Sequence, residues 1–360
     1  MKYPYALPLG TALLTGMAAL PAQANLEVTP YGSLRIQAEA VSVEEDAAID
    51  DDSYTGLRDA YSRLGVTANY DDIDKVDITA TVEFPINSAH LRAEDPTFFQ
   101  HYYKDNSMPR LANIAATHDN YGSLTVGTQW LAYYNHVAYP VDFFSSFYSG
   151  YATQTSFRRD AVTYTTPAMG GFTATVSGVD QTHRNGTRYL DTMQYALSWA
   201  LGDLTLAAGY QDTEQETGDN ADQVGASITY TTGPWRFAAK VEQLLSNNDS
   251  VEDDDPLTYN LYGSYSWSKY TAKAMYAQGE ETDESAAFFQ GDSVHLGLDY
   301  QHTENLKFFA EYFFEERGYA ILQPNSKIHD GVNGDLPLTG YGNPTDADGQ
   351  AIAVGLRYDF

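Results

Sequence analysis

Residues 351–360 of the chain read AIAVGLRYDF, a stretch in which the kind of side chain alternates at every step. Successive side chains of an extended strand point to opposite faces of a sheet. One face carries Ile352, Val354, Leu356, Tyr358 and Phe360, and the other carries Gly355, Arg357 and Asp359. Chain ends usually fray into solvent. An apolar face that continues to Phe360 therefore predicts either a final strand held in a sheet or an end that another molecule recognises.

The same alternation recurs along the chain from Thr29 onward. The stretch YGSLRIQAEA, residues 31–40, puts Leu34, Ile36, Ala38 and Ala40 on one face and mainly polar residues on the other. Such stretches number about sixteen when two poorer patterns near residues 111–117 and 161–165 are included. An even number of strands closes a single-chain transmembrane barrel. The sequence therefore predicts an all-β fold, namely a transmembrane antiparallel β-barrel.

The polar faces of these strands are too highly charged for a packed core. Their charged residues are Arg35, Glu39, Arg63, Asp77, Glu83, Arg236, Lys240, Glu242, Lys273, Lys307 and Glu311. Burial of so many charges is costly, so we expect the polar faces to line a lumen and the apolar faces to meet lipid. Aromatic residues at strand ends, such as Trp130, Trp199 and Trp235, match the aromatic belts of membrane barrels.

Composition excludes other classes of protein. After residue 24 no stretch reaches the roughly 18 consecutive apolar residues of a membrane helix, and the mean hydropathy is −0.41, so a helical membrane protein is excluded. The formal net charge of −29 argues against nucleic acid as a partner. The chain contains no Cys, so the fold needs a closure other than disulfides, and a barrel provides one.

The first 24 residues differ in kind from the rest. They contain one cation, Lys2, then an apolar run over residues 6–20, and then Pro21 before the small-x-small ending Ala22, Gln23, Ala24. This pattern is typical of a cleaved secretory signal peptide. We therefore expect residues 1–24 to be removed on export and residues 25–360 to form a single barrel domain.

The connections between the strands alternate between short turns and long loops, and the first long loop is expected at roughly residues 43–60. Short periplasmic turns and long external loops are the signature of outer-membrane barrels. Acidic residues collect in the long loops, in EEDAAIDDD (residues 44–52), EDDD (252–255) and EETDE (280–284). These runs are either solvated loops without a specific role or sites where divalent cations bridge to the phosphates of lipopolysaccharide.

Taken together, these stretches resemble the general-diffusion porins of Gram-negative outer membranes, which are trimeric barrels of sixteen strands. The resemblance is carried, in this order, by YGSLRIQAE, SRLGV, YGSLTVGTQW, RRDAVTYTTPAMGGF and GLRYDF. It implies a homotrimer in the outer membrane, in contact with lipid and lipopolysaccharide, that passes small hydrophilic solutes and ions by passive diffusion. It also implies that Phe360 belongs to the signal read by the barrel-assembly machinery.

In such porins the third long loop folds into the lumen and faces a ladder of basic residues. The matching loop here spans residues 131–157 and contains one acid, Asp142. Arg35 and Arg63 lie on the lumen parity, and Arg110 matches the family's arginine at the start of the fourth strand. Of Arg158 and Arg159, alternation counted back from Val162 and Tyr164 points Arg159 inward, although a bulge would exchange the two.

Aromatic residues crowd the same loop, where the family has more acids. Tyr133, Tyr139, Phe143 and Tyr148 either pack the folded loop against the wall or form an aromatic track that stacks on solutes. The second reading defines an alternative function, a substrate-selective channel for sugars or aromatic compounds. In the fourth strand, Asn113 falls on the expected outward parity, which a strand covered by a neighbouring subunit would tolerate.

An enzyme is the less favoured reading. The eight His are scattered, and the GxSxG, HExxH and Walker patterns are absent from the sequence. The acidic runs lack the spacing of a calcium-binding loop. We therefore expect no catalytic residues, no resident metal site and no cofactor. Because some outer-membrane hydrolases are also barrels, conductance without hydrolysis is the observation that separates the two classes.

Overall fold

The computed structural model describes most of the strands and the turns at one of their ends. The described residues are 26–43, 53–73, 75–91, 109–148, 158–180, 190, 192–213, 221–246, 256–280, 291–316 and 348–360. The expected signal peptide, residues 149–157 of the third long loop and nearly all of the acidic runs lie outside them. No helix within these ranges is long and apolar enough to cross a membrane.

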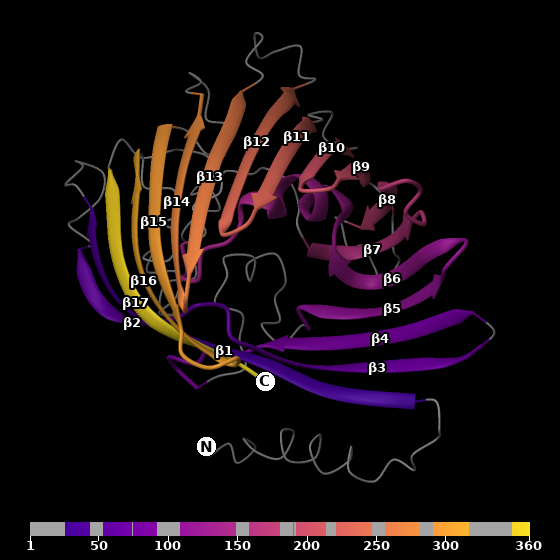
Figure 1. The fold of residues 1–360 in the computed structure, drawn as a ribbon, viewed down its shortest axis with the longest axis horizontal. Coiled ribbons are helices and arrows are strands. Elements are labelled where there is room, and N and C mark those ends of the chain that lie inside the picture. The colour runs from indigo at the N-terminus through magenta and orange to yellow at the C-terminus, as the bar shows by residue number, and fades with distance from the viewer. Residues whose placement is uncertain are drawn as a thin grey trace, which may run out of the picture.

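A single antiparallel sheet curls into a closed ring (Figure 1). The strands are β1 (Leu26–Val43), β2 (Tyr54–Asp59), β3 (Arg63–Ile73), β4 (Val76–Pro85), β5 (Leu111–His118), β6 (Gly122–Trp130), β7 (Arg158–Thr165), β8 (Phe172–Asp180), β9 (Thr192–Leu201), β10 (Leu204–Thr213), β11 (Ala221–Thr232), β12 (Trp235–Ser246), β13 (Leu257–Trp267), β14 (Tyr270–Gly279), β15 (Gly291–Gln301), β16 (Leu306–Glu315) and β17 (Gly349–Asp359). Consecutive strands from β3 to β17 are paired neighbours.

The ring closes through β1, the longest strand. One side of β1 pairs with β17 in a register that runs from Ser33 opposite Asp359 to Val43 opposite Gly349. The other side pairs first with β3, over residues 26–33, and then with β2, over residues 36–41. β2 and β3 therefore occupy one position in the ring, and the barrel has sixteen positions, which confirms the predicted fold class.

One boundary differs from the sequence prediction. Residues 43–60 are expected to form a long loop, but residues 54–59 form β2, which extends the line of β3 along β1. The line is interrupted at residues 60–62, where the Asp59 carboxylate accepts hydrogen bonds from the backbone N–H groups of Ser62 and Ser88, both at 2.9 Å. A side chain that satisfies backbone donors allows the strand to bend there without leaving those donors unpaired.

The two faces of the sheet are reversed relative to a soluble barrel. On β16, Phe308 is 42% exposed whereas Glu311 is 4% exposed. The same contrast holds on β17, where Ile352 is 59% exposed and Ala353 is 1% exposed. Because the apolar faces point outward and the polar faces point inward, the outer surface suits lipid and the lumen suits water.

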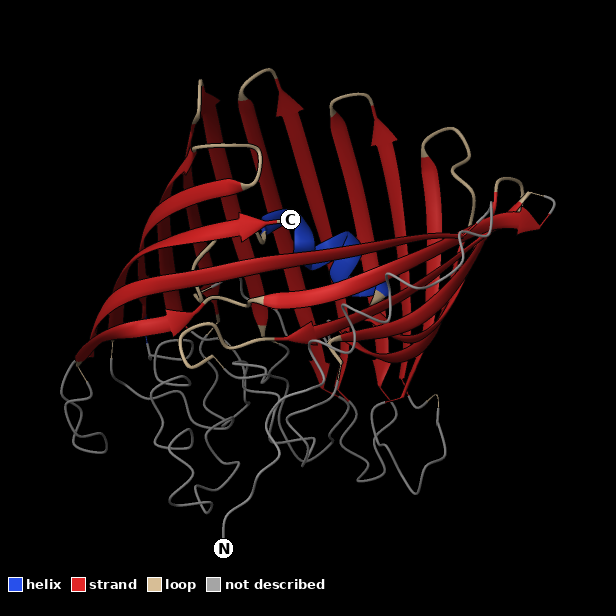
Figure 2. Cartoon of the chain, turned by 90° about the horizontal axis from the view of Figure 1, so that it is seen from below, coloured by secondary structure: helices blue, strands red, loops and turns tan. Residues whose placement is uncertain are grey.

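The described turns that join two consecutive antiparallel strands lie at one end of the barrel (Figure 2). They are short because each joins two antiparallel neighbours, and positive backbone φ values occur where they reverse direction, as at Gly202 (φ 62°) and Gly233 (φ 54°). Glycine adopts such angles without the steric penalty of a Cβ atom. Trp199, Trp235 and Tyr270 lie near these turns with exposed rings, where an interfacial aromatic belt is expected.

The position of Asn113 corrects the expectation for β5. Asn113 is paired with Thr81 and Gly127, and these residues share the lumen-facing parity of Glu83. Ile114, 58% exposed, is the outward residue instead. The short, alanine-rich pattern of this strand has too little contrast between its faces for parity to be assigned from sequence. Asn113 therefore gives no support for a covering subunit.

Candidate functional site

Four arginine side chains converge on one part of the lumen wall. Arg35 lies on β1, Arg63 begins β3, Arg110 directly precedes β5, and Arg357 lies on β17. Arg35 is within electrostatic range of each of the other three. Strand alternation and the closure between β1 and β17 bring these residues together, although Arg357 is far from the others in sequence.

Two carboxylates partly neutralise this cluster of four arginines. Glu83 forms ion pairs with Arg110 and Arg63, whose Nε atoms lie 2.9 Å and 3.5 Å from its carboxylate oxygens. Asp359 pairs with Arg357 at 2.7 Å. Arg35 donates from Nε to Ser33 Oγ at 2.8 Å and has no carboxylate within ion-pair distance in the described part of the chain. Because four cations face two anions, the wall carries net positive charge.

The segment between β6 and β7 lies against other parts of the inner wall. Its described part, residues 131–148, contains a π-helical turn, η2 (Tyr134–Ala138), and a 3-10 turn, η3 (Tyr139–Val141). Figures 1 and 2 show these helical turns on the inner side of the sheet near β10 to β12. The contacts of η2 with β9, β10 and β11, and of η3 with β11, β12 and β13, agree with that placement.

Wall side chains hold the backbone of this segment at several points. The N–H of Tyr133 donates to Gln194 Oε1 at 2.9 Å, and the N–H of Phe147 donates to Gln37 Oε1 at 2.8 Å. Between them, the N–H groups of Ser145 and Ser146 donate to the two carboxylate oxygens of Glu311, at 2.7 and 2.9 Å. Bonds to a charged acceptor are stronger than neutral ones, so Glu311 is the strongest of these attachments.

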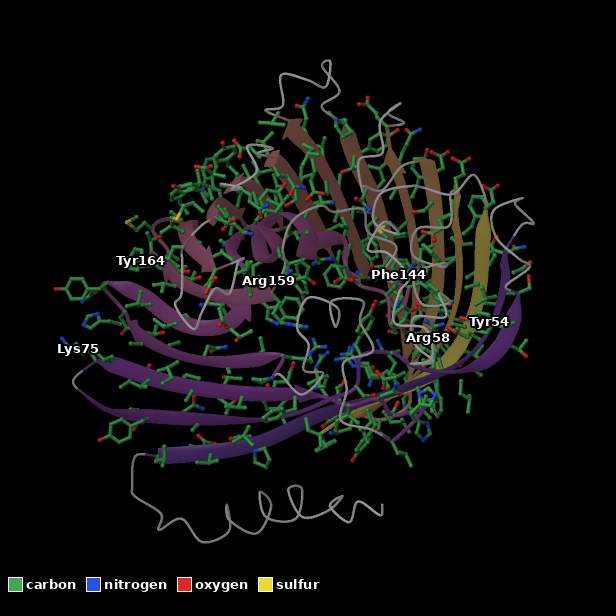
Figure 3. All side chains as sticks on the ribbon, turned by 180° about the vertical axis from the view of Figure 1, so that it is seen from behind. Tyr54, Arg58, Lys75, Phe144, Arg159 and Tyr164 are labelled. Atoms are coloured by element: carbon green, nitrogen blue, oxygen red, sulfur yellow. The ribbon has the colours of Figure 1, made fainter. Side chains whose placement is uncertain are left out.

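Glu311 is itself held by two neighbours on the wall. Lys273 Nζ lies 3.1 Å from Glu311 Oε1, and His295 Nε2 lies 3.1 Å from Oε2. The ring of His295 also stacks on Phe144 of the segment, with centroids 3.5 Å apart. Figure 3 shows Phe144 inside the ring of strands. Charge pairing and ring stacking therefore fix the same stretch of the segment.

The four aromatic residues of the expected track have different environments. Tyr133 is 0% exposed and Tyr148 is 1% exposed. A Cβ atom at Gly225 would lie 2.1 Å from Tyr133 Oη, so the absence of a side chain at Gly225 makes room for this ring. Tyr148 stacks on Phe313 with centroids 5.5 Å apart. These two rings pack the segment against the wall, and only Tyr139, 49% exposed, and the half-buried Phe143 have ring surface to offer.

Asp142 directly follows η3 and is half-buried. Its Oδ2 accepts a hydrogen bond from the Tyr134 hydroxyl at 2.6 Å. Burial raises the pKa of the Asp142 carboxyl to about 6, and the Tyr134 hydrogen bond and the charge of Arg35 oppose that rise. Asp142 is therefore an acid of the segment within electrostatic range of the arginine cluster.

Arg158 and Arg159 open β7 on opposite faces. Arg159 shares the inward parity of Ala161 and Thr163, both buried, and Figure 3 shows it on the inner side of the ring, with Tyr164 on the outside. Arg158 shares the outward parity, and its guanidinium lies 5.5 Å from the centre of the Trp130 ring. The orientation of Arg159 toward the lumen is the one expected from the alternation counted back from Val162 and Tyr164.

Phe360 completes the pairing of the last strand with β1. Its backbone N–H donates to the carbonyl oxygen of Gly32 at 3.1 Å, and its carbonyl accepts from the N–H of Gly32 at 2.9 Å. A Cβ atom at Gly32 would lie 2.4 Å from the Phe360 ring, so the ring occupies the space beside this glycine. The ring also stacks on Tyr358.

Sequence reasoning did not select Arg357 or Glu311 as site residues. The alternation in GLRYDF already places Arg357 opposite the apolar face, so parity is the signal that could have found it. Glu311 also has the polar parity, but its bonds to Ser145 and Ser146 depend on tertiary structure. Among the residues that the structure describes, no three His, Cys, Asp or Glu side chains are grouped to hold a metal ion.

A closed sixteen-position barrel with an apolar exterior and a polar, arginine-bearing interior defines a transmembrane channel of the outer-membrane type. The sequence pattern of one family, described as Gram-negative porin, matches residues 10–317. The chain therefore belongs to the Gram-negative porins, which are proteins of the outer membrane. No curated protein sequence matches it.

Solved structures with the same fold are distant in sequence. The anion-selective porin from Comamonas acidovorans has a TM-score of 0.69 at 18% identity, covering 93% of this chain and 100% of that chain. Salmonella typhi OmpF in complex with daunomycin has a TM-score of 0.66 at 14% identity, covering 95% and 99%. The outer membrane channel DcaP of Acinetobacter baumannii has a TM-score of 0.65 at 13% identity, again covering 95% and 99%.

Proposed function

We propose that the protein forms a water-filled outer-membrane channel through which small hydrophilic solutes and ions diffuse passively. The observation that carries this function is the reversal of the two faces of the sheet. Inward-facing charges such as Arg35, Lys240 and Glu311 need water or partners, and a lumen supplies both. Membership of the Gram-negative porins supports the same function.

The segment at residues 131–157 is proposed to narrow this lumen. Supporting this role, its described part is fastened to β1, β9 and β16 through Gln37, Gln194 and Glu311. Asp142 on the segment and Arg35 on the wall are within electrostatic range of each other. A solute that passes between segment and wall would therefore pass the cluster of four arginines. Arg159 is proposed as a further cation on the lumen wall.

The net positive wall is proposed to favour anions at the narrowest part of the channel, because fixed charge lowers the barrier for ions of opposite sign. The name of the Comamonas porin describes that protein as anion-selective. In this chain the overall charge of −29 acts in the opposite direction, so the local preference is expected to be modest.

Assembly and contacts outside the barrel are also proposals. We infer a homotrimer in the outer-membrane lipid, with divalent cations bridging the acidic loops to lipopolysaccharide, from the resemblance to trimeric porins. Phe360 is proposed to be read by the barrel-assembly machinery, with its pairing to Gly32 as an additional structural role. Residues 1–24 are proposed to be a cleaved signal peptide. Cross-linking of the protein in native membranes tests the trimer directly.

A substrate-selective channel is the second candidate function. The exposed ring of Tyr139 and the half-buried ring of Phe143 favour it, because aromatic faces stack on planar or sugar rings. In that case solutes would interrupt the ion current in discrete blocks. In a channel for simple diffusion, solutes would not block the current in this way.

Planar-bilayer recording of the purified protein tests these functions together. A channel for general diffusion is expected to show ohmic steps of stable size that are insensitive to sugars and aromatic acids. Solute-dependent block would favour the selective channel. An absence of conductance, or hydrolysis of ester, peptide or phospholipid substrates by the purified protein, would contradict the proposed non-enzymatic channel function.

A further inference from the structure

Arg236, on the lumen-facing parity of β12, differs from most of the cations around it. Those cations have carboxylate partners within ion-pair distance: Lys240 with Glu242, Lys273 with Glu311 and Asp299, and Lys307 with Asp299. Arg236 has no carboxylate partner among the described residues, and its Nε atom is buried without a hydrogen-bond acceptor. An arginine with unused donors is a binding group for an anion.

Aromatic rings surround this arginine. Its guanidinium lies 4.3 Å from the centre of the Phe143 ring. The Phe143 ring is 5.4 Å from Tyr139 at an interplanar angle of 53°, and 5.4 Å from Tyr262 at 41°. The exposed face of Tyr139 and the part-exposed Phe143 therefore meet Arg236 at one corner between the segment and the wall.

The neighbouring lysines have carboxylate partners, whereas Arg236 has none in the described part of the chain. Lys273 and Lys307 are matched by Glu311 and Asp299. Arg236 adds a cation to that balanced group. Asp142, which directly precedes Phe143 on the segment, accepts a hydrogen bond from the Tyr134 hydroxyl and forms no ion pair with Arg236 in the described part of the chain. A bound carboxylate would therefore meet a guanidinium group that has no ion-pair partner among the described residues.

We propose that the corner formed by Tyr139, Phe143, Tyr262 and Arg236 binds small aromatic carboxylates as they pass through the channel. The solute ring would stack on the exposed surface of Tyr139 and Phe143, and its carboxylate would accept hydrogen bonds from the terminal Nη groups of Arg236. This inference rests on the proposed function, because solutes reach the corner only if the segment borders the open lumen.

Current block by benzoate tests the inference on the full-length protein in planar bilayers at constant ionic strength. Benzoate is expected to reduce the current reversibly and with saturation. Cyclohexanecarboxylate keeps the charge without the aromatic face, and benzyl alcohol keeps the ring without the charge. Each is expected to bind at least about threefold more weakly than benzoate. Cyclohexanecarboxylate loses the aromatic ring contact, and benzyl alcohol loses the charged hydrogen bond.

Variants assign the block to the corner. Arg236→Gln is expected to weaken the apparent affinity for benzoate by about tenfold or more, and Arg236→Lys, which keeps the charge but not the planar fork, is expected to weaken it less. Phe143→Leu removes the stacking ring and keeps an apolar side chain, which provides a second variant if Arg236→Gln does not fold. Lys269→Gln removes one charge from an exposed turn and is expected to leave the block unchanged.

Several results would overturn the inference while the channel function stands. They are stable conductance without any benzoate block, equal block by benzoate and cyclohexanecarboxylate, and equal benzoate block in the parent and in both Arg236→Gln and Phe143→Leu. An absence of conductance in the parent would overturn the proposed function and this inference with it.

Discussion

At the scale of single residues, Glu83 determines how much of the arginine cluster acts on passing ions. Its carboxylate forms ion pairs with Arg110, with Nε at 2.9 Å, and with Arg63, with Nε at 3.5 Å. It also accepts a hydrogen bond from the Tyr31 hydroxyl at 3.1 Å. A single carboxylate therefore sets the orientation of two guanidinium groups and cancels part of their charge.

Opposite changes at this site should shift ion selectivity in opposite directions. We expect Arg63→Gln combined with Arg110→Gln to raise the permeability of K⁺ relative to Cl⁻, because two fixed cations are lost. Glu83→Gln should lower that ratio. A charge 4 Å away is worth about 1 kcal/mol in water, so changes up to about fivefold are expected. Reversal potentials in a KCl gradient measure them, and shifts of the same sign in both variants would contradict this placement of the charges.

Asp142 should make selectivity depend on pH. Because burial raises the pKa of this carboxyl to about 6, it is mostly ionised at pH 7 and mostly neutral at pH 5. Loss of its negative charge should lower cation permeability as the pH falls through that range. The measurement is the reversal potential at pH 7 and pH 5 in the parent and in Asp142→Asn. An equal pH response in both proteins would show that other groups titrate.

At the scale of elements, the segment at residues 131–148 has a firm attachment at Glu311 and an open surface at Tyr139. These two properties lie on different residues, so they can be changed independently. The buried rings of Tyr133 and Tyr148 belong with the attachment, because they fill space against the wall.

Glu311→Gln should loosen the segment. The variant keeps one carbonyl oxygen as an acceptor. It loses the charged carboxylate that accepts hydrogen bonds from the N–H groups of Ser145 and Ser146 and pairs with Lys273. Hydrogen bonds to charged groups contribute about 1.5–3 kcal/mol each, so we expect frequent brief current fluctuations in single-channel records. Glu304→Gln, at an exposed turn, is the matched control, and Tyr139→Ala should also leave the record quiet. Equal noise in all three would mean that Glu311 does not anchor the segment.

The strands could be predicted from sequence more fully than the attachments of this segment. Alternate side chains of a strand face the lumen and the exterior. The inward orientation of Arg159 and the two faces of β17 could therefore be assigned from the alternation of the sequence alone. Where the contrast is low, as around Asn113, the same rule misassigns the face. The bonds of Glu311 to Ser145 and Ser146 join residues far apart in the chain, and the division of the four rings into buried and exposed depends on gaps such as the one beside Gly225.

At the scale of the whole molecule, β1 carries the closure of the ring. It has β17 along one edge and both β2 and β3 along the other. Phe360 lies at the end of this seam, paired to Gly32 through two backbone hydrogen bonds.

Phe360→Lys should therefore reduce the amount of folded barrel in the outer membrane much more than it changes the conductance of assembled molecules. The ring that fills the space at Gly32 is lost, and a charge is placed on a lipid-facing parity. Heat-dependent gel mobility of outer-membrane fractions measures the folded amount, and bilayer recording measures the conductance. Tyr358→Phe keeps an aromatic ring on the same face and serves as the control. Normal levels of folded Phe360→Lys would falsify the structural role assigned to this residue.

The seam between β1 and β17 also bears on how fast the molecule can form. Pairing of Ser33 with Asp359 joins residues separated by nearly the whole chain, and contacts of that kind lose the most chain entropy before they return any stabilisation. Until it forms, the curled sheet has two unpaired edges that can bind strands of other chains. Pairing of these edges is therefore expected to occur late in folding. The longer the sheet stays open, the greater is the chance that the chain aggregates with other chains.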